Sequence, residues 1–230
     1  MDTSKDYNDV ADLYDETFSS IKPRRKELKW LMQRIPGKVR VLDIGCGNGA
    51  LLREISNSRK EISGVGIDTS DKLLKKARER SAGYPLLSFI VIADKNMLEF
   101  PDSYFDVTIS MLSFRYIERT KILPEMLRVT KKNGKILIVD MVESDLKLLQ
   151  IPKLVLNKLD AMLTKLLYPQ FSNNLKTLVA SPFWRNMLKR HPIRSRAEYD
   201  KLFKQNGLFP SIQILDIGLK AQIVAYEIRK

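Results

Sequence analysis

The feature that most constrains this chain is the run Val-Leu-Asp-Ile-Gly-Cys-Gly-Asn-Gly at residues 41–49, where a buried-strand pattern meets a glycine-rich turn. Glycine lets a turn adopt positive φ values and approach a ligand closely, because it has no Cβ atom. Dinucleotide-binding turns usually read Gly-x-Gly-x-x-Gly. Here the spacing is Gly-x-Gly-x-Gly, and Asp43 stands two residues before the first glycine. This end of the strand is expected to bind a nucleotide.

A second acidic residue follows the next predicted strand. Residues 62–67 are apolar and end at Asp68 and Thr69. At the tip of the second strand of a strand-helix-strand unit, one carboxylate can accept hydrogen bonds from both hydroxyls of a ribose. Asp68 is therefore the predicted ribose ligand.

Four motifs in this order resemble those of the class I S-adenosylmethionine-dependent methyltransferases, between residues 41 and 141. The resemblance implies S-adenosyl-L-methionine as cofactor and S-adenosyl-L-homocysteine as product. Beyond the glycine turn and Asp68, the motifs are a third strand ending in an acid at 89–94, a turn into a fourth strand at 100–110, and a helix, turn and fifth strand at 125–140. In the last motif Asn133-Gly134 stands where the family often has Pro-Gly-Gly, and it also favours a turn with positive φ.

The resemblance also implies which residues bind the cofactor. The family's third-strand acid accepts from the adenine amino group, so Asp94 is expected at the adenine and Lys95 at the rim. A helix before the core folds over the cofactor in related small-molecule enzymes, which makes Tyr14 a lid candidate, although an aromatic on a helix can simply pack. The expected cofactor-binding set is Tyr14, Asp43, Gly45, Cys46, Gly47, Gly49, Asp68, Thr69, Asp94, Lys95, Ser110 and Met111.

On the substrate side, the family places residues that face the transferable methyl group just after the fourth strand. The string at 108–117 is locally similar to the ubiquinone and menaquinone C-methyltransferases, so a quinone precursor is one candidate acceptor. Phe114 and Arg115 are candidate substrate contacts, since the guanidinium fork of Arg115 can hold a carboxylate or phenolate. His191 is chemically apt as a general base, with a plain basic-loop residue as the alternative. No catalytic residue is assigned.

Strand and helix patterns alternate along the chain, which predicts an α/β fold. We expect a Rossmann-like, doubly wound, mostly parallel seven-stranded sheet, closed by a C-terminal antiparallel hairpin around Gly218. One methyltransferase domain is expected over 1–230, with N-terminal lid helices in 1–30 and a helical substrate-cap insert at 142–192 between strands five and six. The expected strands are 40–44, 62–67, 88–93, 105–110, 135–140, 212–216 and 221–226.

Within the insert, residues 153–168 show helical periodicity. Their apolar residues recur every three or four positions. We expect this stripe to pack on the core, and it could also roof a hydrophobic substrate pocket or rest on a bilayer. The stripe comprises Val155, Leu159, Met162, Leu163 and Leu166.

The net charge of +13 fits a nucleic acid, an anionic membrane surface, an acidic substrate or a lysine-rich solvated surface. Basic residues gather at 22–29, next to Trp30, and again at 183–196. Basic residues interleaved with aromatics can bind phosphates and stack on bases. Against nucleic acid, the fourth strand lacks the Asn/Asp-Pro-Pro-aromatic motif usual in family members that methylate nucleobase amines.

Several classes are disfavoured by what the sequence lacks. It has no apolar run of about 20 residues and no secretory signal core, so we expect a cytoplasmic protein, with peripheral association at a membrane as an alternative. The single cysteine, Cys46, permits no internal disulfide and is expected to pack. No metal-ligand motif is present, and no metal is expected.

The function expected from the sequence is methyl transfer from S-adenosylmethionine to a small, apolar or amphipathic acceptor. The alternatives are an RNA or protein methyltransferase that uses the basic surface, and a cofactor-binding protein without catalysis. The oligomeric state is not predicted.

Overall fold

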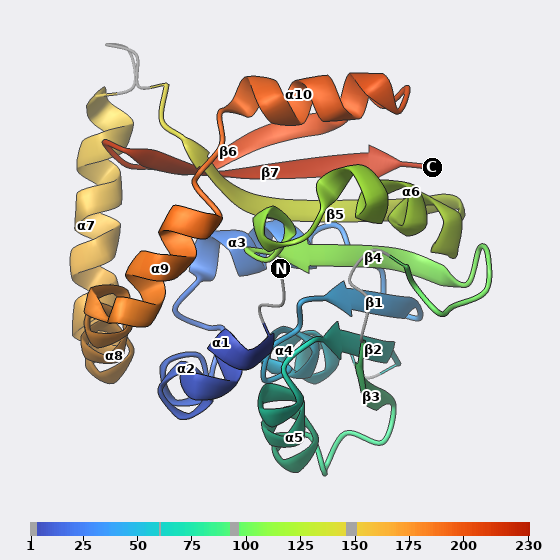
Figure 1. Ribbon diagram of the computed structural model, residues 1–230, viewed down its shortest axis with the longest axis horizontal. Helices are drawn as coiled ribbons and strands as arrows, with labels where there is room; N and C mark the ends of the chain where they lie inside the picture. The colour runs from blue at the N-terminus through green and yellow to red at the C-terminus, as the bar shows by residue number, and fades with distance from the viewer. Residues whose placement is uncertain (1–3, 60, 93–96, 146–150) are drawn as a thin grey trace.

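The computed structural model describes residues 4–59, 61–92, 97–145 and 151–230, and it contains a seven-stranded sheet in the order β3-β2-β1-β4-β5-β7-β6 (Figure 1). Neighbouring strands are parallel except for β7, which is antiparallel to both β5 and β6. The predicted sheet and its C-terminal hairpin are confirmed. The strands are β1 (Arg40–Ile44), β2 (Ser63–Asp68), β3 (Leu87–Val91), β4 (Phe105–Met111), β5 (Thr130–Glu143), β6 (Ser211–Ile217) and β7 (Ala221–Arg229).

Helices cover both faces of the sheet because its inner strands are apolar on both sides. In β1, Val41 packs with one layer of helices, while Leu42 and Ile44 pack with the opposite layer. The first layer contains α3 (Arg25–Met32), α4 (Ala50–Ser58) and α5 (Asp71–Arg80), and the second contains α6 (Arg119–Val129) and α10 (Arg196–Gln205).

The carboxyl ends of β1, β2 and β4 meet at one edge of the sheet, since these strands are parallel and in register. Two short helices, α1 (Ser4–Asp9) and α2 (Ala11–Thr17), lie near this edge, within the segment 1–30 where lid helices are expected (Figure 1). A short 3-10 helix, η1 (Phe114–Tyr116), follows β4 there. The turn expected at Asn133 is confirmed by its positive φ of 64°.

The segment between β5 and β6 contains three further helices, α7 (Ile151–Leu167), α8 (Pro169–Ala180) and α9 (Pro182–Arg190), before α10. Rings of α8 and α9 contact the N-terminal segment: Phe171 lies 6.0 Å from Phe18, and Phe183 lies 5.4 Å from Tyr7, between ring centroids. In Figure 1, α7 stands at the left edge of the molecule, with α8 below it and α9 on its inner side. In the described part of the chain, no helix combines the length and hydropathy needed to span a membrane.

The expectation that the apolar stripe of α7 packs on the core is wrong. Leu159, Met162 and Leu166 are 55%, 69% and 77% exposed, and Leu163 is 42% exposed. The side chain of Val155 lies outside the described residues.

A polar face of α7 is turned toward the body of the protein instead. Asn157 donates from Nδ2 to the carbonyl of Ile217 at 2.8 Å and accepts from Nζ of Lys26 at 2.7 Å. Asp160 pairs with Arg25 and, at 3.4 Å, with Lys26. These hydrogen bonds and ion pairs fix the rotation of α7 and leave its apolar side outward.

The same contacts change the interpretation of the first basic cluster. Arg25 and Lys26 are engaged with Asp160, and Trp30 is 2% exposed within the core. Trp30 is therefore unavailable for stacking on a base, and the nucleic-acid interpretation loses its aromatic partner at this cluster.

A buried hydrogen bond between Tyr199 and Asp140 yields a test of the core. The hydroxyl of Tyr199 donates to Oδ2 of Asp140 at 2.8 Å, and both residues are fully buried. In the variant Tyr199→Phe the acceptor loses this donor, so the free energy of unfolding should fall by about 1–3 kcal/mol. Urea denaturation would measure it. The matched change Tyr104→Phe, at a residue 36% exposed, should be close to neutral. Equal stability of the two variants would contradict the assigned bond.

Candidate active site

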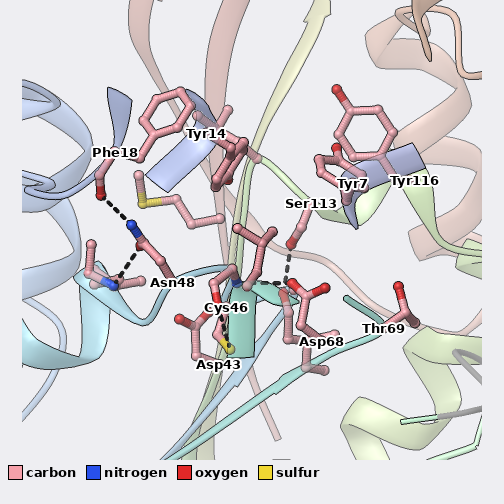
Figure 2. Close-up of a pocket in the computed structure, with 18 of the residues that line it drawn as sticks. Tyr7, Tyr14, Phe18, Asp43, Cys46, Asn48, Asp68, Thr69, Ser113 and Tyr116 are labelled. Carbon is pink, nitrogen blue, oxygen red and sulfur yellow. Dashed lines mark hydrogen bonds between the residues drawn. The ribbon is translucent and has the colours of Figure 1, made fainter. Parts of the chain in front are cut away.

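A cavity of about 120 Å³ lies at the carboxyl ends of β1, β2 and β4, with side chains of α1 and α2 contributing to its wall (Figure 2). Eight predicted cofactor residues line it, which places the glycine turn, the second-strand acid and the lid aromatic around one space. They are Tyr14, Asp43, Gly45, Cys46, Gly47, Asp68, Thr69 and Met111.

The three glycines of the turn have positive φ values of 74°, 55° and 74° at Gly45, Gly47 and Gly49. A Cβ atom at Gly47 would lie 3.2 Å from the ring of Tyr14, and one at Gly49 would lie 2.6 Å from the ring of Phe89. Gly45 and Gly47 line the cavity without side chains, so a ligand can approach their backbone closely. Gly49 is the N-cap residue of α4, and its lack of a side chain leaves room for the packing of the core.

Asp68 is oriented by backbone amides at the end of β2. Its Oδ2 accepts from the amide of Gly47 at 2.9 Å, and its Oδ1 accepts from the amide of Ser70 at 3.0 Å. The carboxylate is therefore held on the cavity wall by the glycine turn and by its own following turn (Figure 2).

Asp43 is the more deeply buried acid, at 2% exposure. Burial, assisted by the negative charge of Asp68, raises the pKa of Asp43 to about 7. A cation entering the cavity would favour its ionised form and lower this pKa. Burial also raises the pKa of the Cys46 thiol, whose sulfur lies where a side chain at Gly66 would sit, so Cys46 packs as a neutral thiol.

A clamp joins the glycine turn to α2. Nδ2 of Asn48 donates to Oδ1 of Asp15 at 2.9 Å and to the carbonyl of Phe18 at 3.0 Å. Asp15 also accepts from Nε and Nη2 of Arg80 at 2.8 and 2.7 Å. Burial acts to raise the pKa of Asp15, but the hydrogen bonds from Arg80 and Asn48 outweigh it and leave the pKa below its usual value. This ionised clamp holds the aromatic residues of the lid over the cavity.

An aromatic group forms the side of the cavity away from Asp43. The ring of Tyr7 lies 5.9 Å from that of Tyr14 and 6.2 Å from that of Tyr116, and all three line the cavity. Arg115 stacks over Tyr116 at 4.5 Å and donates to its hydroxyl, while His191 meets the same ring edge-on at 5.4 Å. Two predicted substrate-side residues thus converge on Tyr116.

The remaining predicted residues lie elsewhere. Phe114 is fully buried and packs against Tyr199 at 6.2 Å, which places it in the core rather than on the cavity wall. Ser110 is also fully buried and shares a 2.8 Å hydrogen bond with Ser113, which does line the cavity. Asp94 and Lys95 lie outside the described residues.

Sequence reasoning missed several cavity residues. Tyr7 and Phe18 belonged to the predicted lid pattern, but only their contacts distinguish them from packing aromatics. Leu112 has a φ of 57°, an unusual value that no sequence motif indicates. The other missed residues include Arg24, Ser113 and Tyr116.

Comparison with known proteins shows similarity to methyltransferases over the central part of the chain. Residues 42–138 match the model of the family described as "Methyltransferase domain", which spans the glycine turn and the first five strands. This part of the chain is thus similar to methyltransferase domains, in agreement with the resemblance of its motifs to the class I S-adenosylmethionine-dependent methyltransferases.

Two curated relatives and one solved structure illustrate this similarity. The chain is 35% identical to the ubiquinone/menaquinone biosynthesis C-methyltransferase of Geobacter sulfurreducens over 44% of its own length and 41% of the relative. It is 31% identical to the phosphatidylethanolamine N-methyltransferase of Cereibacter sphaeroides over 56% of its own length and 63% of the relative. A SAM-dependent methyltransferase from Aquifex aeolicus shares the fold, with a TM-score of 0.58, 19% identity and coverage of 90% and 93% of the two chains. The chain thus spans only part of these curated relatives.

The described residues of the cavity fit S-adenosylmethionine, the cofactor that the resemblance implies. Asp68 presents a carboxylate to the cavity as a ribose diol requires, and Asp43 offers a buried negative charge to a cationic ligand. The glycine turn lets both acids approach the same space.

The clamp provides a test of lid closure. In Asn48→Ala, α2 loses two hydrogen bonds, each worth about 0.5–1.5 kcal/mol. Amide hydrogen exchange should become faster across residues 7–18 while the sheet stays protected. Asn173→Ala, at an exposed position of α8, is the matched control. Unchanged exchange in the lid of Asn48→Ala would show that packing alone holds α2.

Proposed function

We propose that this protein transfers a methyl group from S-adenosylmethionine to a small, apolar or amphipathic acceptor. One observation carries the proposal: a single cavity has the two acids and the glycine turn on one side and a cluster of tyrosines on the other. The first side fits the cofactor, and the second fits an acceptor with apolar surface.

Each group on the cofactor side has a separate task in this proposal. Asp68 accepts from the ribose hydroxyls, the turn at Gly45 and Gly47 gives close backbone approach, and Asp43 balances the cofactor's positive charge. The bound cofactor supplies an activated methyl group on a sulfonium. The chain itself contributes position and exclusion of water, because Tyr14 and Phe18 close over the cavity.

The proposed acceptor side is aromatic, and its phenol groups stay protonated. Burial raises the pKa values of Tyr7 and Tyr116, so both phenols stay protonated at neutral pH and can donate hydrogen bonds to an acceptor oxygen. Arg115 and His191 position Tyr116 from outside the cavity wall. The names of the two curated relatives point to a quinone precursor and a phospholipid, which both combine an apolar tail with a polar head.

Calorimetry tests the cofactor site first. The parent protein should bind S-adenosylmethionine, and Asp68→Ala should bind it more weakly by about 1–3 kcal/mol, because the ribose hydroxyls lose a charged acceptor. Asp102→Ala changes an acid that is exposed and outside the cavity, and it should bind as the parent does.

Turnover is then measured with methyl-labelled cofactor and separate pools of apolar small molecules, RNA and protein. The proposal expects label in the apolar pool. Label only in RNA or protein would overturn the acceptor class, and tight binding without any transfer would indicate a non-catalytic cofactor-binding protein.

Asp43 should couple cofactor binding to proton release. With a pKa of about 7, it carries about half a proton at pH 7 in the free protein. A bound cation lowers this pKa, so binding releases that proton, with little release at pH 9 and more toward pH 6. Calorimetry at pH 7 in two buffers of different ionisation enthalpy measures the release. Asp43→Asn should abolish it, and release that persists in this variant would assign the proton to another group.

A further inference from the structure

We propose that α7 docks this protein on an anionic lipid bilayer, with its outward apolar side inserted at the interface. The outer stripe of α7 consists of Leu156, Leu159, Met162, Leu163, Leu166 and Leu167, which are 42–77% exposed. Docking through this stripe does not require methyl transfer, and the two proposals can fail separately.

The rotation of α7 makes the outer stripe a specific feature. An amphipathic helix on a globular protein normally turns its apolar side to the core. Here the polar side faces inward instead, held by the bonds of Asn157 to Ile217 and Lys26 and by the pairing of Asp160 with Arg25. Apolar side chains that gather on one exposed helix face mark an interaction surface.

The hairpin tip next to α7 adds to the same apolar region. Leu219 lies between β6 and β7 and is 71% exposed. It lines a groove together with Lys158 and Ala161 of α7. Apolar side chains from two separate elements thus border the groove.

The charge around the outer stripe indicates which partner it binds. Lys158 and Lys165 are exposed and lie two helical turns apart on α7 itself, beside the stripe. Between residues 156 and 194 the only acid is Asp160, which is paired, whereas seven lysines and arginines in this range are exposed, namely Lys158, Lys165, Lys176, Arg185, Lys189, Arg190 and Arg194. An apolar helix face bordered by lysines is typical of helices that lie in the interface of anionic membranes.

A second copy of the chain fits the same surface less well. A symmetric dimer places one patch against itself. Pairing two outer stripes would bring Lys158 and Lys165 close to their own counterparts, and the described part of α7 offers only the already paired Asp160 as a balancing acid. A bilayer rich in anionic lipid satisfies both the apolar face and the lysines.

Vesicle sedimentation tests the docking. The full chain should bind vesicles of phosphatidylglycerol and phosphatidylcholine, and bind pure phosphatidylcholine vesicles much more weakly. The triple variant Leu159→Ser, Met162→Ser, Leu166→Ser should lower the partition coefficient at least about tenfold, because it removes most of the inserted apolar area. Phe209→Ser is the matched control, since Phe209 is 85% exposed outside α7 and should not affect binding.

A second variant tests the electrostatic contribution to vesicle binding. Lys158→Glu with Lys165→Glu should lower binding to the anionic vesicles at least about tenfold, since each basic residue near a charged membrane contributes roughly a fivefold gain. Circular dichroism and cofactor affinity should match the parent in both sets, because the changed side chains are exposed and lie outside the cavity.

Insertion is read directly with an environment-sensitive fluorophore. The label is placed on Met162→Cys or Phe209→Cys, and the native Cys46 is buried. Anionic vesicles should shift the emission of the label at 162 to the blue and leave that at 209 unchanged. Absence of vesicle binding by folded parent protein, or equal binding by the triple variant, would overturn the proposal. So would a parent dimer that binds no vesicles and dissociates in the triple variant, which would assign the stripe to a second copy.

Discussion

The site depends on keeping two carboxylates close together at the buried end of a parallel sheet. The Asp68 carboxylate accepts from the amides of Gly47 and Ser70, whereas burial and the negative charge of Asp68 raise the pKa of Asp43. The glycine turn makes this possible, because its positive φ values point an amide at Asp68 and leave the space beside both acids clear of Cβ atoms. The result is a cavity whose field favours a cation.

The lid depends on the same turn. Asn48 lies between two of the glycines and ties α2 to the sheet through Asp15, which Arg80 holds from α5. The rings of α8 and α9 then pack on the lid at Phe18 and Tyr7. The proposed acceptor side is therefore built by the lid and by the insert that packs on it. The insert contacts the cavity wall indirectly, by packing on the lid and by the contact of His191 with Tyr116.

The sequence predicted the sheet well, and eight of the residues expected to bind the cofactor line one cavity. Alternating strand and helix patterns specify a parallel sheet, and parallel strands bring Asp43 and Asp68 to one edge without further information. On the proposed acceptor side the sequence indicated Arg115 and His191 but missed Tyr7 and Tyr116, because only the folded chain brings these distant segments together. Phe114 was predicted at the substrate side because it is close in sequence to the end of β4. Its ring is instead buried in the core.

The sequence by itself determined where the strands lie along the chain, the glycine turn and the acids at the ends of β1 and β2, because each follows from local periodicity and backbone freedom. Only the tertiary structure decided which side of α7 faces solvent. The periodicity defines an apolar stripe but carries no information on its direction, which is fixed by the bonds of Asn157 and Asp160 to residues far away in the sequence. In the same way, burial raised the pKa of Asp43, and burial is a property of the folded chain alone.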